Sequence, residues 1–228
     1  MRLADLFRKR ARRNPLEEYF FNNPGRLIHK WHHYFEIYHR HFERFRGRAP
    51  VVVEIGVYHG GSLQMWRDYF GTGAHIVGVD INPECRMLAG ESMTVMIGDQ
   101  SDRRFLAELR ARFPRIDIVI DDGGHTMEQQ ITTFEELYPH LQPEGVYVCE
   151  DIHTSYMAEY GGGYLRQGSF VELAKGLIDR LHAWYTDGPE IDAFTHSTFG
   201  LHFYGNVMVA EKRPMQAPVQ SKTGTPSI

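Results

Sequence analysis

The chain is short of cysteine and has no long apolar run. Its two cysteines, Cys85 and Cys149, do not form a CxxC pair, so the sequence favours neither a disulfide framework nor a thiolate metal site. No apolar run approaches the roughly 18 residues of a membrane span, and no signal-peptide core follows the basic N-terminus. These absences predict a soluble protein of the reducing cytoplasm, without a membrane span.

The chain also lacks a strong excess of charge of one sign. Its formal net charge is −4 with histidines neutral, which gives no general case for binding nucleic acid. Residues 1–13 are locally basic, and they read either as an amphipathic helix on a partner or anionic surface, or as a solvated and frayed terminus. A length of 228 residues, with 42% hydrophobic and 24% charged residues, fits one α/β domain.

Carboxylates end two short apolar runs in the middle of the chain. The runs 116–120 and 146–149 are rich in β-branched residues, as fully buried parallel strands are. Ligands of open α/β sheets bind beyond the carboxyl ends of the strands, so the polar residues that follow both runs are expected to meet. Unpaired buried charge is costly, and a divalent cation is the simplest compensation. These polar residues are Asp121, Asp122, His125, Glu150, Asp151 and His153.

A glycine-rich turn follows the first predicted strand, residues 51–55. The turn runs from Gly56 to Gly61 and leads into a helix that Ser62 is expected to cap. The second strand ends in Asp80, roughly twenty positions after the turn, where nucleotide-binding sheets hold the ribose hydroxyls. The turn lacks the G-x-G-x-x-G spacing of a dinucleotide site. The sequence therefore favours a nucleoside without a pyrophosphate.

A third strand and a hairpin complete the predicted sheet. Strand 94–97 leads to Asp99 and Gln100, which could contact an adenine edge. Alternatively, Asp99 is an acidic residue at a helix start, where the helix dipole favours negative charge. Ser101 is expected to cap that helix. Gly205-Asn206 is a turn between two β-rich runs and predicts a hairpin.

Aromatic residues recur at helical spacing between Leu27 and Phe45. This stripe is too apolar for a lone surface helix, so we expect a homo-oligomer, a dimer or tetramer, built partly with it. His29 and His33 have the i,i+4 spacing of a metal-binding pair, but no carboxylate or cysteine completes the set, and ordinary helix surface is the favoured interpretation.

These motifs together resemble the class I S-adenosylmethionine-dependent methyltransferases. More narrowly, they resemble the metal-dependent sugar O-methyltransferases of macrolide biosynthesis, the mycinamicin type, and the related cephalosporin-hydroxylase-like family. The resemblance implies a Rossmann-like, doubly wound α/β fold, with a mostly parallel seven-stranded sheet, a C-terminal antiparallel hairpin and N-terminal helices. The stretches that carry it are 54–62, Asp80, 120–125, 150–156 and the hairpin 202–212.

The resemblance also divides the chain and assigns roles to residues. Residues 1–49 become an N-terminal helical segment for oligomerisation or for use as a lid, 50–212 the methyltransferase domain, and the proline-rich, polar stretch 213–228 a disordered tail. The implied metal ligands for Mg²⁺, or another divalent cation such as Mn²⁺, are Asp122, Glu150 and Asp151, with His125 as the base. The implied contacts to S-adenosylmethionine are Glu54, Gly56, Tyr58, Gly61, Ser62, Asp80, Asp99, Gln100 and Asp121.

The implied activity is O-methylation of a sugar or of a glycosylated natural product. A hard cation would bind two neighbouring hydroxyls and lower the pKa of one, and His125 would take its proton. A catechol-type O-methyltransferase would use the same chemistry on an aromatic diol. An iron-dependent hydroxylase would need two histidines and a carboxylate, which His125, His153 and Asp151 supply, but Asp80 would then have no role. A non-catalytic nucleoside-binding module is the remaining alternative.

Overall fold

The computed structural model describes residues 13–228. The N-terminal residues 1–12, on which the predicted amphipathic helix falls, lie outside the described residues. None of the helices within 13–228 is long and apolar enough to cross a membrane.

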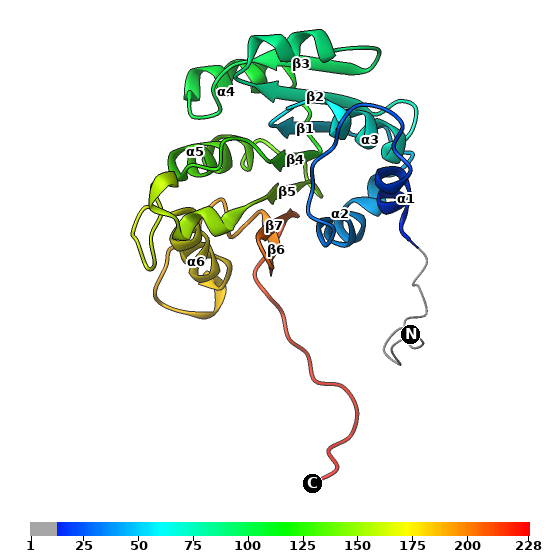
Figure 1. The fold of residues 1–228 in the computed structure, drawn as a ribbon. Coiled ribbons are helices and arrows are strands. Elements are labelled where there is room, and N and C mark those ends of the chain that lie inside the picture. Colours follow the sequence, from blue (N-terminus) through cyan, green and yellow to red (C-terminus); the bar gives the residue numbers. More distant parts are fainter. Residues whose placement is uncertain (1–12) are drawn as a thin grey trace, which may run out of the picture.

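A seven-stranded sheet forms the centre of the molecule, in the order β3-β2-β1-β4-β5-β7-β6 (Figure 1). The first five strands in this order are parallel, whereas β7 pairs antiparallel with both β5 and β6. This confirms the predicted doubly wound, mostly parallel sheet with its C-terminal hairpin. The strands are β1 (Val51–Ile55), β2 (His75–Asp80), β3 (Met93–Ile97), β4 (Ile118–Asp121), β5 (Val146–Cys149), β6 (Thr198–Tyr204) and β7 (Val207–Lys212).

Helices cover both faces of the sheet (Figure 1). One face carries α1 (Pro15–Phe21), α2 (Tyr34–Phe42) and α3 (Gly61–Phe70), and the other carries α4 (Arg103–Arg112), α5 (Met127–Leu137) and α6 (Phe170–Leu181). Because both faces are covered, successive residues of a strand are all buried: Val52 packs toward α3 and Val53 toward α4 and α5. This is why the strands read as continuous apolar runs. Short 3-10 helices lie at Glu43–Phe45, Pro83–Leu88, Ile152–Tyr156, Ala158–Tyr160 and Ala183–Tyr185.

The part of the aromatic stripe that lies on α2 is buried inside this one chain. Helix α2 begins only at Tyr34, so Leu27 and Trp31 lie outside it, with exposed fractions of 54% and 56%. Tyr38 and Phe42 are fully buried, and the Tyr38 ring meets the Trp66 ring of α3 edge-on at 5.1 Å. The α2 part of the apolar face from which we predicted a dimer or tetramer is therefore covered within the chain, whereas Leu27 and Trp31 stay exposed.

Two helices begin at residues other than the predicted caps. Gly60, in the left-handed conformation with φ 72°, is the N-cap of α3, and the Ser62 hydroxyl donates to Glu54 instead. Asp102 caps α4, whereas Ser101 binds the carboxylate of Asp99. Ser101 and Asp102 are equally good caps by type, so the sequence could not choose between them, whereas Gly60 is by type a weaker cap than Ser62.

Gly61 allows the extended segment before α2 to lie directly on α3. A Cβ at Gly61 would stand 2.3 Å from the carbonyl oxygen of Leu27 and 2.5 Å from that of Arg26. We expect Gly61→Ala to lower the free energy of unfolding by about 1–3 kcal/mol, because backbone cannot move aside as a side-chain end can. Denaturant unfolding measures this effect.

The matched control for this prediction is Gly176→Ala in α6, where a Cβ would meet nothing within 4 Å. This change is expected to raise the stability by up to about 1 kcal/mol, because alanine favours the helix more than glycine does. Equal effects of the two substitutions would contradict the close packing at Gly61.

Candidate active site

A cavity of about 480 Å³ opens at the carboxyl ends of β1 to β4. The glycine turn after β1, the end of β2 and the loops after β3 and β4 form its walls. This is the edge at which open α/β sheets bind ligands. Five of the residues predicted to contact the methyl donor line this cavity: Gly56, Tyr58, Asp80, Asp99 and Gln100.

Asp80 orders the glycine turn as well as facing the cavity. Its Oδ2 accepts hydrogen bonds from the backbone N–H groups of Val57, at 2.9 Å, and Tyr58, at 3.1 Å. Gly56 has φ 92°, and a Cβ there would stand 2.0 Å from the carbonyl oxygen of Asp122. The turn after β1 can therefore lie close to the loop after β4 only because residue 56 is glycine.

Three other residues predicted to contact the donor, Glu54, Ser62 and Gly61, lie outside the lining of this cavity. Glu54 is fully buried and accepts hydrogen bonds from Ser62 Oγ at 2.7 Å and Trp66 Nε1 at 3.0 Å. Burial raises the pKa of Glu54. Gly61 packs against the backbone of the segment before α2. These residues support the site from beneath the cavity.

Asp121 also lies behind the cavity wall. It is fully buried and accepts hydrogen bonds from Gln100 Nε2 at 2.8 Å and from the Tyr147 hydroxyl at 3.1 Å. Burial raises the pKa of Asp121 to about 7. The Gln100 Oε1 accepts from the backbone of Gly124 at 2.9 Å. Asp121 thus fixes the side chain of Gln100, which does line the cavity, rather than lining it itself.

A second cavity, of about 300 Å³, adjoins the first at the ends of β4 and β5. Tyr58 and Asp122 line both cavities. The sheet contributes the predicted base and all three predicted metal ligands, and the N-terminal segment contributes the opposite wall. The residues of this second cavity are His29, Lys30, Trp31, Tyr34, Tyr58, Asp122, His125, Glu150 and Asp151.

Three ligand-type side chains converge in this cavity. His125 Nε2 lies 3.7 Å from Asp122 Oδ1 and 3.5 Å from Asp151 Oδ2. One ligand atom from each of the three residues lies within 4.8 Å of the others, so the group can surround a small cation. The group differs from the predicted ligand set, because it includes His125 and leaves out Glu150.

Glu150 is bonded on the buried side of the same cluster. Its Oε1 accepts the Tyr38 hydroxyl at 2.5 Å, and Lys30 Nζ lies 2.9 and 3.0 Å from its two oxygens. Burial raises the pKa of Glu150 well above its usual range. The ammonium of Lys30 supplies a counter-charge where the sequence suggested a divalent cation as the simplest compensation.

Lys30 was missed by the sequence analysis. Its Nζ also reaches Asp122 Oδ2 at 2.5 Å and Glu54 Oε1 at 3.7 Å, with the side chain only 3% exposed. Burial alone would lower the pKa of Lys30, but the surrounding carboxylates outweigh burial and raise it, so the amine stays charged. A lysine in an aromatic stretch carries no local sign of this role.

Tyr34 and Asn206 are two further residues that the sequence did not reveal. The Tyr34 hydroxyl and the Asn206 Nδ2 each donate to Asp151 Oδ1 at 2.7 Å. Asp151 has φ 52°, a conformation that costs energy for a non-glycine residue and persists when its surroundings hold it. These contacts leave Asp151 Oδ2 turned toward His125.

The structure weakens two of the other metal hypotheses. His153 lies outside the converging group. Its Nδ1 binds Asn206 Oδ1 and stands 3.9 Å from Asp151 Oδ1. The two-histidine, one-carboxylate set of the hydroxylase alternative is therefore not assembled. His29 and His33 precede α2, and His33 Nε2 binds the carbonyl of Gly205, so their i,i+4 spacing does not place them on one helix face.

The fold, with its cavities at the carboxyl edge of the sheet, is similar to that of known methyltransferases. Residues 53–152 match the sequence profile of the family described as "Methyltransferase domain". This stretch contains β1 through β5 and every predicted metal ligand. Residues 53–152 are therefore similar to this family.

Curated relatives narrow the comparison. The chain is 41% identical over 197 residues to 8-demethyl-8-alpha-L-rhamnosyl tetracenomycin-C 2'-O-methyltransferase of Streptomyces olivaceus, covering 81% of this chain and 52% of the relative. It is 37% identical over 188 residues to mycinamicin VI 2''-O-methyltransferase of Micromonospora griseorubida, covering 77% and 47%. The chain thus spans about half the length of the curated relatives it matches.

A solved structure shows the same fold. The MycE methyltransferase of the mycinamycin biosynthetic pathway, in complex with Mg, SAH and mycinamycin VI, superposes with a TM-score of 0.77 at 32% sequence identity. The match covers 87% of this chain and 53% of that one.

Proposed function

We propose that this protein is an S-adenosylmethionine-dependent and divalent-metal-dependent O-methyltransferase that acts on a hydroxyl of a sugar or glycosylated natural product. The observation that carries this proposal is the junction of the two cavities. The donor-type cavity and the cavity with His125, Asp122 and Asp151 share Tyr58 and Asp122. A donor in the first cavity therefore adjoins an acceptor in the second.

The first cavity suits S-adenosylmethionine. Asp80 lies at the end of β2, where a ribose is usually held through its hydroxyls, and Asp99 and Gln100 follow β3 along the same edge. The cavity has no G-x-G-x-x-G turn for a pyrophosphate. The SAH in the MycE structures, the demethylated product of this donor, supports the same choice.

The second cavity suits Mg²⁺ or Mn²⁺ together with a hydroxyl acceptor. Asp122 and Asp151 would hold the ion, with His125 or Glu150 beside them, because oxygen ligands suit hard cations. A bound ion would lower the pKa of an acceptor hydroxyl. His125 would take the hydroxyl proton, and Tyr34 and Asn206 would keep Asp151 in place.

Exposed aromatic rings flank the second cavity. Trp31 and Tyr58 line it with exposed fractions of 56% and 63%, and apolar walls around a few polar groups are typical of small-molecule sites. The glycosylated substrates in the names of the relatives support a glycoside acceptor. A catechol-type acceptor would use the same ion and base, and only an acceptor assay separates the two.

A transfer assay tests this function directly. Labelled S-adenosylmethionine is incubated with deoxysugar glycosides, nucleotide sugars and catechols, with and without a chelator. We expect transfer to a glycoside, loss of transfer on chelation and recovery with added Mg²⁺. Transfer to catechols alone would favour the catechol-type enzyme. Donor binding without any transfer would favour a nucleoside-binding module, and a requirement for 2-oxoglutarate and oxygen would favour the hydroxylase.

Asp80 provides a separate test of the donor cavity. We expect Asp80→Ala to weaken S-adenosylmethionine binding by about 1.5–3 kcal/mol, the usual loss for a hydrogen bond to a charged group. Calorimetry measures the affinity, and a thermal melt checks that the turn held by Asp80 remains folded. Asp179→Ala, at an exposed position of α6, is the control that leaves affinity unchanged. Unchanged binding in Asp80→Ala would remove this residue from the donor site.

The assembly and the location of the protein remain predictions. The buried part of the aromatic stripe does not support a dimer or tetramer, and light scattering at working concentration would detect either. A cytoplasmic location is expected from the scarcity of cysteine alone.

A further inference from the structure

Lys30 binds the same carboxylates that a divalent ion would need. Its Nζ lies 2.5 Å from Asp122 Oδ2 and within 3.0 Å of both oxygens of Glu150. The Tyr38 hydroxyl takes a further position on Glu150 Oε1. Of the two carboxylates, Asp122 also has an oxygen near His125, because its Oδ1 lies 3.7 Å from His125 Nε2. Glu150 is therefore bonded to Lys30 on both of its oxygens.

An ammonium and a divalent ion cannot both contact Glu150 at these distances without strong repulsion. Two like charges a few ångströms apart in a buried site repel far more than they would in water. Lys30 is 3% exposed and Glu150 is 1% exposed, so solvent screens the repulsion little. If Glu150 becomes a metal ligand, the ammonium must withdraw.

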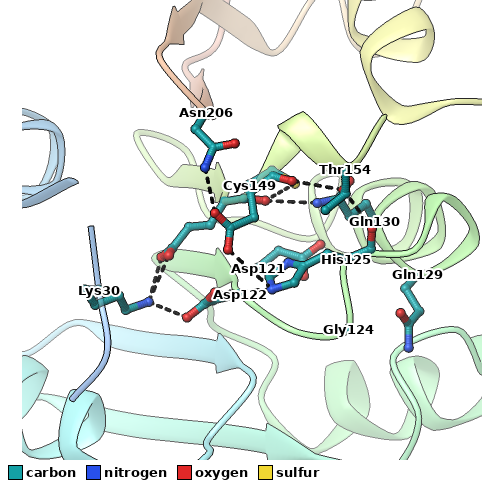
Figure 2. A network of polar contacts seen from close by, with 12 residues as sticks. Lys30, Asp121, Asp122, Gly124, His125, Gln129, Gln130, Cys149, Thr154 and Asn206 are labelled. Atoms are coloured by element: carbon teal, nitrogen blue, oxygen red, sulfur yellow. Dashed lines mark hydrogen bonds and ion pairs between the residues drawn. The ribbon is translucent and has the colours of Figure 1, made fainter. Parts of the chain in front are cut away.

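Lys30 belongs to the extended N-terminal segment between α1 and α2, and its side chain points to Asp122, 92 positions later in the sequence (Figure 2). Arg26 anchors one end of this segment through Leu88 O at 2.9 Å, and His33 anchors the other through Gly205 O at 2.9 Å. The neighbours of Lys30 on this segment, His29 and Trp31, line the second cavity. Withdrawal of Lys30 together with its backbone, rather than by a change of rotamer alone, would move part of the acceptor wall.

We propose that Lys30 is a built-in competitor of the divalent ion: the ammonium and the ion exclude one another at Glu150, and ion binding releases Lys30 and shifts the wall that carries Trp31. The inference rests on the proposed function, because it concerns the same site. It gives the N-terminal segment a part in the chemistry, since metal occupancy and the shape of the acceptor cavity become linked. The linkage is reciprocal, so an acceptor that holds the shifted wall would tighten ion binding.

The first test measures ion affinity without any acceptor. Mg²⁺ and Mn²⁺ are titrated by calorimetry into the wild type, Lys30→Met and Lys30→Arg. Removal of the competing charge is expected to tighten binding at least about tenfold in Lys30→Met, whereas Lys30→Arg stays near the wild type. Lys175→Met removes an exposed lysine that pairs with Glu172 on α6, and this control is expected to leave affinity unchanged.

The second test distinguishes displacement from a simple effect of charge, and it needs no variant. The wild type is treated briefly with acetic anhydride, and labelling of each lysine is read by mass spectrometry with and without Mg²⁺. Hydrogen exchange is followed over residues 26–33 in parallel. We expect Mg²⁺ to increase both the acetylation of Lys30 and the exchange of this segment, while Lys175 labels equally in both conditions.

The outcomes separate the inference from the proposed function. Tighter binding in Lys30→Met together with Mg²⁺-dependent labelling supports competition. Saturating Mg²⁺ that leaves Lys30 unlabelled shows that ammonium and ion share the site, and it overturns the inference while leaving a metal-dependent transferase intact. Methyl transfer that proceeds fully in a chelator, with no ion bound to any variant, overturns both. If Lys30→Met does not fold, the labelling of the wild type decides alone.

Discussion

Asp151→Ala is expected to reduce methyl transfer by about 10³-fold or more, because a Lewis-acid cation supplies several kcal/mol and each ~1.4 kcal/mol is a factor of ten in rate. Asp151 has one oxygen held by Tyr34 and Asn206 and the other turned into the cavity toward His125. Its removal leaves the ion with fewer anionic ligands, so ion binding should be lost first and activity with it.

For Asp151→Ala, the amount of bound metal and the rate of methyl transfer should both be measured at increasing Mg²⁺ concentrations. Partial recovery at high Mg²⁺ would show that the residue acts through the ion. Asp179→Ala is the control for loss of a carboxylate at the surface. A variant that keeps full activity, or a native enzyme indifferent to chelators, would contradict the metal assignment.

His125→Ala is expected to lower turnover by about 10²–10⁴-fold, the usual contribution of a positioned general base. Affinity for S-adenosylmethionine should be unchanged, because His125 does not line the donor cavity. Single-turnover transfer measures the chemical step, and His196→Ala, an exposed histidine far from both cavities, is the control.

Metal affinity decides between two roles for His125. Its Nε2 lies within the converging group of ligand atoms, so it is placed to act either as a base beside the ion or as a ligand. If His125 acts as a base, His125→Ala leaves the Mg²⁺ affinity nearly unchanged. Loss of Mg²⁺ binding in His125→Ala would instead make it a ligand and would contradict the predicted set of three carboxylates.

The sheet and its functional edge were predictable because they rest on local patterns. Strands buried on both faces leave continuous apolar runs, and the carboxylates of Asp122, Glu150 and Asp151 follow such runs directly. The parallel strand order then brings these residues to one edge. The predicted carboxylates line the second cavity for this reason.

Glu54 and Asp121 lie outside the lining of the donor cavity for one physical reason. Successive side chains of a strand point to opposite faces, so Glu54 shares the face of Val52 and points toward α3, where it meets Ser62 and Trp66. Asp121 shares the face of Val119 and meets Tyr147. Both are strand residues that point into a layer beside the sheet, rather than residues just past its edge.

The contributions of Lys30, Tyr34 and Asn206 could not be predicted from local patterns. Lys30 and Asp122 are 92 positions apart, and Asn206 and Asp151 are 55 apart. No periodicity relates such residues, and only the packed structure brings them together. The aromatic spacing likewise predicted a helix through Leu27 and Trp31. In the structure α2 begins at Tyr34, and the chain at Leu27 is extended and packs on Gly61.

The turn between β6 and β7 sets how small a working catalytic fragment can be. The family signature stops at residue 152, yet Asn206 donates to Asp151 and its carbonyl oxygen accepts from the backbone of Ile152 at 3.2 Å. At the other end, Lys30 and Tyr34 precede the signature, which begins at residue 53. A chimaera that contained only residues 53–152 would have the predicted metal ligands but would lack Lys30, Tyr34 and Asn206, which bind them. The junctions of a chimaera should therefore lie outside residues 26 and 212.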